Sequence, residues 1–296
     1  MKQANFSKQV ANAWNRLPLI TGAVLTGFLV SSVGIAVWTV LLSVMPAPWP
    51  VLPMIIALIA YCKFFNGRIG PKKGMELKRF HFRAIKLSPS VWKWSITAAI
   101  FFVVIVQASF VITFRLIDFP ADKFTADYKI LDSLPVWIAW VVLIMGSIVA
   151  GICEEVGFRG YMQVPLEKKY GPVAAIVITS IVFMLIHLSH SWARPILPHI
   201  FFASVLLGIL AWKSGSIIPG IIGHSILDIF DYSIWWSDIT GGFKMQTIFK
   251  TGIDLNFIVC CLVFILGLFV FSRSVGMIKR NSLNKLQTQD RSAGLY

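Results

Sequence analysis

The stretch that decides the fold is GICEEVGFRGYMQVPLEKKYGPVAAIVITSIVFMLIHLSHSW, residues 151–192. Its first turn signal is Tyr170-Gly171-Pro172, so a helix that begins upstream is expected to continue through the charged residues near 154–159. The part after the turn is apolar and ends in histidines. Two helices closed by a short turn form an antiparallel hairpin. The sequence therefore predicts a helical hairpin that carries polar side chains far from its turn.

Apolar residues dominate the rest of the chain as well. Of 296 residues, 57% are hydrophobic and 14% are charged, more apolar than a soluble domain can keep from aggregating, so the solvent must be lipid. No β-alternation typical of a membrane barrel is visible, and helices satisfy their own backbone in lipid. Apolar runs comparable to a spanning helix occur at 17–45, 51–65, 92–117, 135–153, 172–192, 196–212, 216–236 and 254–272. We predict an all-α, polytopic transmembrane helix bundle with about eight spanning helices.

The charged residues predict its orientation. The net charge of +14 comes from basic residues that cluster between apolar runs, which favours anionic lipid and topology over nucleic acid as the reason. Segment 66–90 is basic, whereas segment 118–134 carries four aspartates against two lysines. With segment 66–90, the N-terminus and the tail inside, an even number of crossings fits the charges, and eight crossings place both termini in the cytoplasm. We expect a multi-pass protein of a bacterial inner membrane.

Three parts of the chain follow from this topology. They are a cytoplasmic segment 1–16, a transmembrane domain 17–273 and a cytoplasmic tail 274–296, with a motif region at 154–228. The four cysteines lie in or beside apolar runs without CxxC spacing, so neither a disulfide framework nor a zinc ribbon is indicated.

The adjacent carboxylates Glu154 and Glu155 are the first candidate site residues. On a helix Glu155 and Arg159 are i,i+4 neighbours that can pair, whereas Glu154 is rotated by about 100° and faces another partner. Both could instead be interfacial charges at a helix end.

The histidine that can meet Glu154 is His187. The midpoint between 154 and 187 falls on the predicted turn, so both side chains lie at the same depth, each about 24 Å along its helix. Phe183 shares the face of His187 four residues earlier. His190 lies about one turn further on and is interpreted as a bystander.

The run at 216–236 carries a polar stripe formed by His224, Asp228 and Asp231. Their i, i+4 and i+7 spacing places them on one face of the helix. An aspartate at bilayer depth costs several kcal/mol unless it is paired or solvated, which favours a function. A His-Asp pair that only joins helices is the alternative.

The order EExxxR (Glu154, Glu155, Arg159), FxxxH (Phe183, His187) and HxxxD (His224, Asp228) resembles the CAAX prenyl protease and bacteriocin-processing (CPBP, or ABI) family of intramembrane endopeptidases. The resemblance implies that Glu154 and His187 activate a water for attack on a peptide bond. It implies that His224 and Asp228 bind the oxyanion or complete the site, and that Arg159 is structural. Many members have asparagine where this chain has Asp228, and an ionised aspartate cannot donate a hydrogen bond to an oxyanion. Asp228 could instead orient His224 or ligate a metal.

The sequence does not decide whether the predicted protease requires a metal ion. A zinc ion would be held by Glu154, His187 and His224, although the HExxH pattern is absent, so a metalloprotease and a metal-free glutamate mechanism are both retained. The expected partners are membrane lipids and a peptide or protein substrate at the membrane, prenylated or leader-bearing, and no nucleic acid. An ion-coupled transporter and a non-catalytic immunity or scaffold protein of the same fold are the alternative functions.

Overall fold

A computed structural model of the chain describes residues 16–70, 74–126, 129–237 and 246–278. All of the regular structure in these ranges is helical, which confirms the predicted fold class. The predicted segments 1–16 and 274–296 lie almost wholly outside the described residues. The long helices are α2 (Leu19–Val44), α3 (Val51–Phe65), α5 (Pro89–Leu116), α8 (Val136–Glu154), α9 (Gln163–Ile186), α10 (Leu197–Ser214), α11 (Ile218–Ser237) and α13 (Leu255–Met277).

Each predicted apolar run corresponds to one long helix or, at 172–192, to the second part of α9. Proline stands at or beside the first residue of α2, α3, α5 and α8, where its missing N–H breaks no helical bond. The side chain of Asp254 caps α13 by accepting a hydrogen bond from the backbone N–H of Phe257 at 2.8 Å.

The predicted number of eight spanning helices is not confirmed. Within the described ranges, five elements are long and apolar enough to cross a membrane: α2, α5, α10 extended from Arg194, α13, and the continuous element Val136–Ser189. That last element contains two of the predicted runs, because α8 and α9 belong to it. The helix α3 is apolar but has only 15 residues, and α11 is not among the five.

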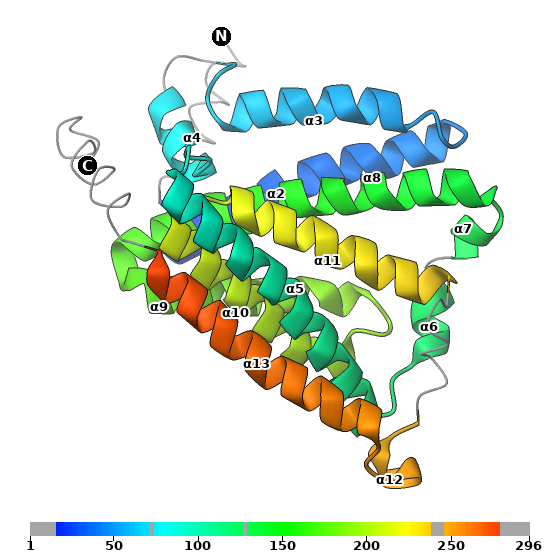
Figure 1. Ribbon diagram of the computed structural model, residues 1–296. Coiled ribbons are helices and arrows are strands. Elements are labelled where there is room, and N and C mark those ends of the chain that lie inside the picture. Colours follow the sequence, from blue (N-terminus) through cyan, green and yellow to red (C-terminus); the bar gives the residue numbers. More distant parts are fainter. Residues whose placement is uncertain (1–15, 71–73, 127–128, 238–245, 279–296) are drawn as a thin grey trace.

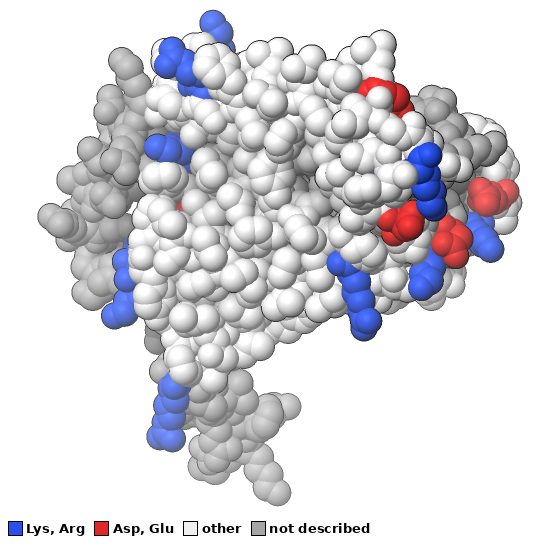
Figure 2. Space-filling view, turned by 90° about the horizontal axis from the view of Figure 1, so that it is seen from below, with Lys and Arg blue, Asp and Glu red and all other residues white. Residues whose placement is uncertain are grey.

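Short helices that the sequence analysis did not predict lie at the two ends of the bundle (Figure 1). The amphipathic α4 (Met75–Phe82) is at one end, within the basic segment 66–90. At the other end lie α6 (Ala121–Ala126), α7 (Lys129–Asp132) and α12 (Ile248–Thr251). Figure 2 shows Lys and Arg along both edges and most of the visible Asp and Glu at one of them, with a broad surface free of charge between the two edges. Such a belt is what lipid contact requires.

The packing of the long helices positions the interior. The helices α5 and α13 pack side by side along their length, and α10 and α11 pack against α5. On the other side α2 lies against α8 and the segment after it. Large apolar side chains such as Ile56 on α3 and Leu262 on α13 are 70% and 61% exposed, so the outer surface of these two helices is apolar. The polar residues described next lie between these two halves.

Candidate active site

The predicted hairpin is present. Within α9, Gly171 has φ 79° and ψ 165°, a backbone conformation that glycine adopts at little cost and that ends one helix before Pro172 begins the next. Phe158 and Phe183 stand at equal distances in sequence from this turn, and their rings contact edge to face at 5.1 Å. The two arms therefore run antiparallel in the predicted register.

The helix that carries the glutamates continues past residue 154, as predicted, but with a different geometry. Residues Glu155–Met162 form a π-helix, here called η1, between α8 and α9. Such segments are rare and are frequent at functional sites. All eight of its residues are buried, so its charges are held inside the protein rather than at a helix end near headgroups.

Glu155 and Arg159 form an ion pair in the interior. The distance from Arg159 Nη1 to Glu155 Oε1 is 3.0 Å, and both side chains are 0% exposed. Arg159 also donates from Nη2 to Ser204 Oγ at 3.0 Å, and its guanidinium lies 4.7 Å from the centre of the Phe183 ring. The pair expected from the i,i+4 spacing is therefore present, and it links η1 to α9 and α10.

Glu155 also connects η1 to α11. His224 Nδ1 donates a hydrogen bond to Glu155 Oε1 at 2.9 Å. The backbone of α11 approaches so closely that a Cβ at Gly220 would lie 2.9 Å from Glu155 Oε2. Only glycine fits at that point without displacing the carboxylate. The group that orients His224 is thus Glu155, a role that the sequence analysis had considered for Asp228.

The other nitrogen of His224 faces two carboxylates. Its Nε2 is 3.8 Å from Glu154 Oε2 and 3.7 Å from Asp228 Oδ1, both too long for a hydrogen bond. The side chain of Glu154 is 15% exposed, whereas that of Glu155 is fully buried. Glu154 is therefore the carboxylate that a water or a substrate can reach.

His187 is oriented by the backbone of its own helix. It lies at the end of α9, where a short 3₁₀-helix (His187–Ser189) begins, and its Nδ1 is 2.7 Å from the carbonyl oxygen of Phe183. A carbonyl only accepts, so Nδ1 must carry the proton. In the neutral ring this leaves the lone pair on Nε2. His187 therefore has an acceptor available for chemistry.

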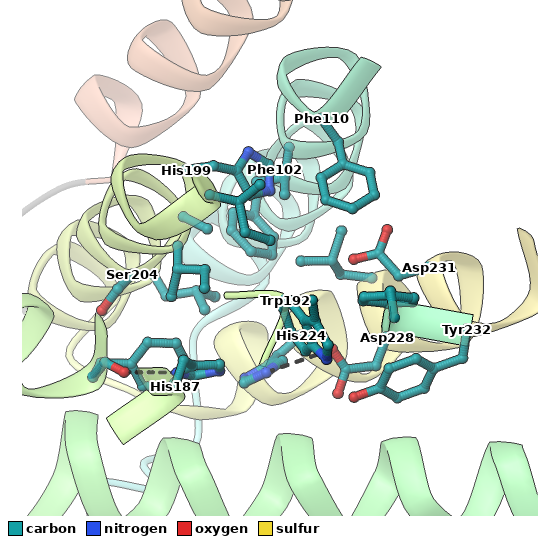
Figure 3. Close-up of a pocket in the computed structure, with 18 residues that line it drawn as sticks. Phe102, Phe110, His187, Trp192, His199, Ser204, His224, Asp228, Asp231 and Tyr232 are labelled. Carbon is teal, nitrogen blue, oxygen red and sulfur yellow. Dashed lines mark hydrogen bonds and ion pairs between the residues drawn. The ribbon is translucent and has the colours of Figure 1, made fainter. Parts of the chain in front are cut away.

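Two hollows meet at His187. A groove of about 580 Å³ runs beside α2 and contains Glu154, His187 and His190 together with Ser32 and Thr39 of α2. A second, smaller cavity of about 110 Å³ lies on the other side, between α5, α10 and α11. Figure 3 shows this cavity with His187 and His224 along one side and Phe102, Phe110 and His199 along the opposite side. His187 lines both, so the candidate site connects them.

The cavity also contains polar residues outside the three motifs. Asp231 accepts a hydrogen bond from the side-chain amide of Gln107 at 2.5 Å, and His199 Nδ1 lies 3.0 Å from Ser109 Oγ. Asp231 belongs to the polar stripe predicted from the sequence, whereas Gln107 and His199 were not predicted. Each of the latter is an isolated polar residue in an apolar run, which is the signal that could have identified them.

The helix α4 supports η1 from the basic end of the bundle. The ring of His81 lies 5.5 Å from that of Tyr161, and burial lowers the pKa of His81 to about 4, so its imidazole is neutral at pH 7. Just after α4, Arg83 forms a bidentate pair with Glu167 of α9 at 2.9 and 3.0 Å. These contacts fix the segment that carries the candidate glutamates.

The positions of Glu154, His187 and His224 bear on the prediction that they hold a zinc ion. Among the described residues, no three His, Cys, Asp or Glu side chains are arranged to hold a metal ion, and this includes Glu154, His187 and His224. The site as it stands therefore does not fit a three-ligand metal centre. The metal requirement remains a prediction for experiment.

Fold and site define a class: an integral membrane helix bundle with glutamate and histidine side chains gathered in its interior. Residues 135–230 match the sequence model of a family described as type II CAAX prenyl endopeptidase Rce1-like. The match spans α8 to α11 and contains all seven motif residues, and it confirms the family resemblance seen in the sequence. No curated protein and no solved structure matches the chain.

Proposed function

We propose that this protein is an intramembrane endopeptidase that hydrolyses a peptide bond of a membrane-associated protein or peptide. The observation that supports this most strongly is the position of Glu154. Its carboxylate lines an open groove that His187 also lines, and it lies 3.8 Å from His224 Nε2. A reactive carboxylate that a peptide can approach, within a low-dielectric interior, suits general base catalysis.

The proposed reaction begins with a water held between Glu154 and His187. Glu154 removes one proton, and the lone pair on His187 Nε2 accepts a hydrogen bond from the same water. The water oxygen then bonds to the carbonyl carbon of the peptide. The proton held by Glu154 passes to the amide nitrogen as the C–N bond breaks, so one water is consumed and a carboxylic acid and an amine are formed. The acid then gives its proton to the amine, which leaves a carboxylate and an ammonium.

His224 has the position to stabilise the oxyanion. Because Nδ1–H donates a hydrogen bond to Glu155, Nε2 is the nitrogen that faces Glu154. In the imidazolium form Nε2 carries a proton that can bond a developing negative charge. Asp228 is 3.7 Å from this nitrogen and would stabilise the imidazolium electrostatically. This gives Asp228 a role that requires no hydrogen-bond donation.

We further propose a multi-pass inner-membrane location with cytoplasmic termini and with membrane lipids as partners. The family resemblance implies a prenylated or leader-bearing substrate. The metal-free mechanism is favoured over the metalloprotease because the described side chains offer no three-ligand group. An ion-coupled carrier and a non-catalytic scaffold are the competing functions.

The test uses purified protein in liposomes with bilayer-spanning peptides, and new termini are identified by mass spectrometry. We expect cleavage by the wild type and loss of cleavage in Glu154→Ala and His187→Ala. Glu76→Gln, an exposed carboxylate on α4, is the control that should cleave normally. Undiminished cleavage by both alanine variants would refute the proposal that this site is a protease active site. Transport of an ion or solute without cleavage would favour the carrier.

A further inference from the structure

The cavity beyond His187 and His224 contains a carboxylate that the proposed reaction does not use. Asp231 lies one turn after Asp228 on α11 and lines this cavity. Its one hydrogen bond to a described side chain comes from the neutral amide of Gln107. Among the described residues, no Lys, Arg or His lies within ion-pair distance of Asp231. A carboxylate at this depth is costly without a cation or a proton.

A second acceptor faces the same cavity. The hydroxyl of Ser109 donates to the carbonyl of Val106 at 2.9 Å, so its oxygen accepts a hydrogen bond from His199 Nδ1 at 3.0 Å. The neutral His199 ring then has its lone pair on Nε2. No described side chain donates to this nitrogen. The cavity is therefore lined by two acceptors, the Asp231 carboxylate and His199 Nε2, that a donor from a ligand could satisfy.

The charges of the whole site point the same way. Four carboxylates (Glu154, Glu155, Asp228 and Asp231) gather around His224, and Arg159 is the single Arg or Lys among the described residues that pairs with any of them. Arg159 is committed to Glu155. A ligand that carries one positive charge would reduce this excess of negative charge.

The remaining walls suit an apolar stem. Phe102, Val106, Phe110, Leu207 and Leu227 line the same cavity as Asp231, His187 and His224. A single water needs a cavity volume of about 10–15 Å³. A cavity of about 110 Å³ therefore has room for several waters or for one long side chain.

We propose that this cavity is a subsite for a lysine side chain next to the cleaved bond of the substrate. Its methylene stem would contact the phenylalanine and leucine walls, and its ammonium would donate to Asp231 and His199 Nε2. An ammonium offers three donors on a flexible apolar stem, which suits a cavity that is lined by apolar side chains and by two acceptors. The subsite rests on the proposed function, because it assigns a substrate side chain to the same site.

The test compares peptides that differ only in the residues flanking the cleaved bond, with lysine, norleucine or arginine at each position. Norleucine has the length of the lysine stem without the ammonium. Cleavage is measured in liposomes for the wild type, Asp231→Asn and His199→Phe, with Asp118→Asn as a control at an exposed aspartate. The readout is the ratio of kcat/KM for lysine and norleucine peptides within one preparation, so a loss of folded protein cancels.

At one flanking position the wild type and Asp118→Asn should prefer lysine by about 30-fold or more, the usual effect of a buried charge pair. Asp231→Asn should reduce this ratio to near one, and His199→Phe should reduce it in part. Equal rates for lysine and norleucine in the wild type, or a preference that survives both substitutions, would overturn the subsite.

Failure of the proposed function is distinguishable from failure of the subsite. If the wild type cleaves no peptide, binding of the same labelled peptides is measured by fluorescence anisotropy. Tighter binding of the lysine peptide that is lost in Asp231→Asn would support the subsite although the protein is no protease. Equal binding of lysine and norleucine peptides would reject the subsite as well.

Discussion

The groove beside α2 and the cavity between α5 and α11 meet at His187, but they present different environments. The groove is open and has hydroxyls of Ser32 and Thr39 along α2, groups that can hydrogen-bond an extended peptide backbone. The cavity is smaller and mostly apolar, with polar side chains such as His187, His224 and Asp231 among phenylalanines and leucines. The difference separates two tasks. The groove can admit water and a peptide bond to Glu154, and the cavity can select a side chain.

The same division explains why two adjacent glutamates differ. Glu155 faces the interior, where Arg159 and His224 hold it, and Glu154 faces the groove. The interior carboxylate fixes the framework, whereas the groove carboxylate is free to exchange a proton. Substitutions on the two sides should therefore have different consequences, and the following predictions compare them.

The largest effect on stability is expected on the interior side. Arg159→Met leaves Glu155 buried without its cation, which should cost about 3–5 kcal/mol of folding free energy. Arg68→Met, at an exposed arginine, is the matched control and should change little. Unfolding in detergent can be followed with a thiol-reactive dye at the buried Cys153. Equal stability of the two variants would show that the buried pair does not hold the site.

A bulky side chain in the groove should impair binding rather than folding. Ala36→Trp places an indole among the groove residues of α2, and we expect KM to rise by about tenfold, equivalent to 1.4 kcal/mol of binding. Val37→Trp is the control, because Val37 is exposed on the same helix but does not line the groove. If both variants have the same KM, the peptide does not enter beside α2.

Asp228→Asn should have a small effect. No hydrogen bond joins Asp228 to His224, and Glu155 already orients the ring, so we expect kcat to change by no more than about threefold, less than 1 kcal/mol. The measurement is kcat at saturating peptide. A loss of a hundredfold or more would show that the charge of Asp228 is essential to the imidazolium and that Glu155 alone does not maintain His224 in its active state.

Removal of metal should have the smallest effect. Since the described residues offer no group of three ligands, treatment with a chelator followed by elemental analysis should leave the cleavage rate unchanged. Loss of activity that stoichiometric zinc restores would contradict this and would revive the metal set of Glu154, His187 and His224.

Much of this arrangement could be predicted from the sequence because lipid imposes simple rules. Apolar length located the long helices, and the turn at Gly171 fixed the register of the hairpin. That register is what brings the Phe158 and Phe183 rings together and places His187 beside the groove of Glu154. These features depend on one segment or on one pair of segments, so residue spacing alone is enough to predict them.

The features that sequence could not give depend on how several helices meet. The π-helical geometry of Glu155–Met162 arises in the packed interior, and the hydrogen bond from His224 to Glu155 joins segments 69 residues apart. Gln107 and His199 belong to the site only because α5 and α10 pack around the same cavity as α11. Spacing within one helix contains no information about such contacts.

The central claim is that Glu154 activates the water that cleaves the peptide. It is tested most directly by the single-turnover rate of Glu154→Gln with a cleaved peptide, measured against the wild type and Glu76→Gln. Loss of a general base should slow the chemical step by about 10²–10⁴-fold, while peptide binding and stability stay those of the wild type. A Glu154→Gln variant that cleaves at the wild-type rate would contradict the account.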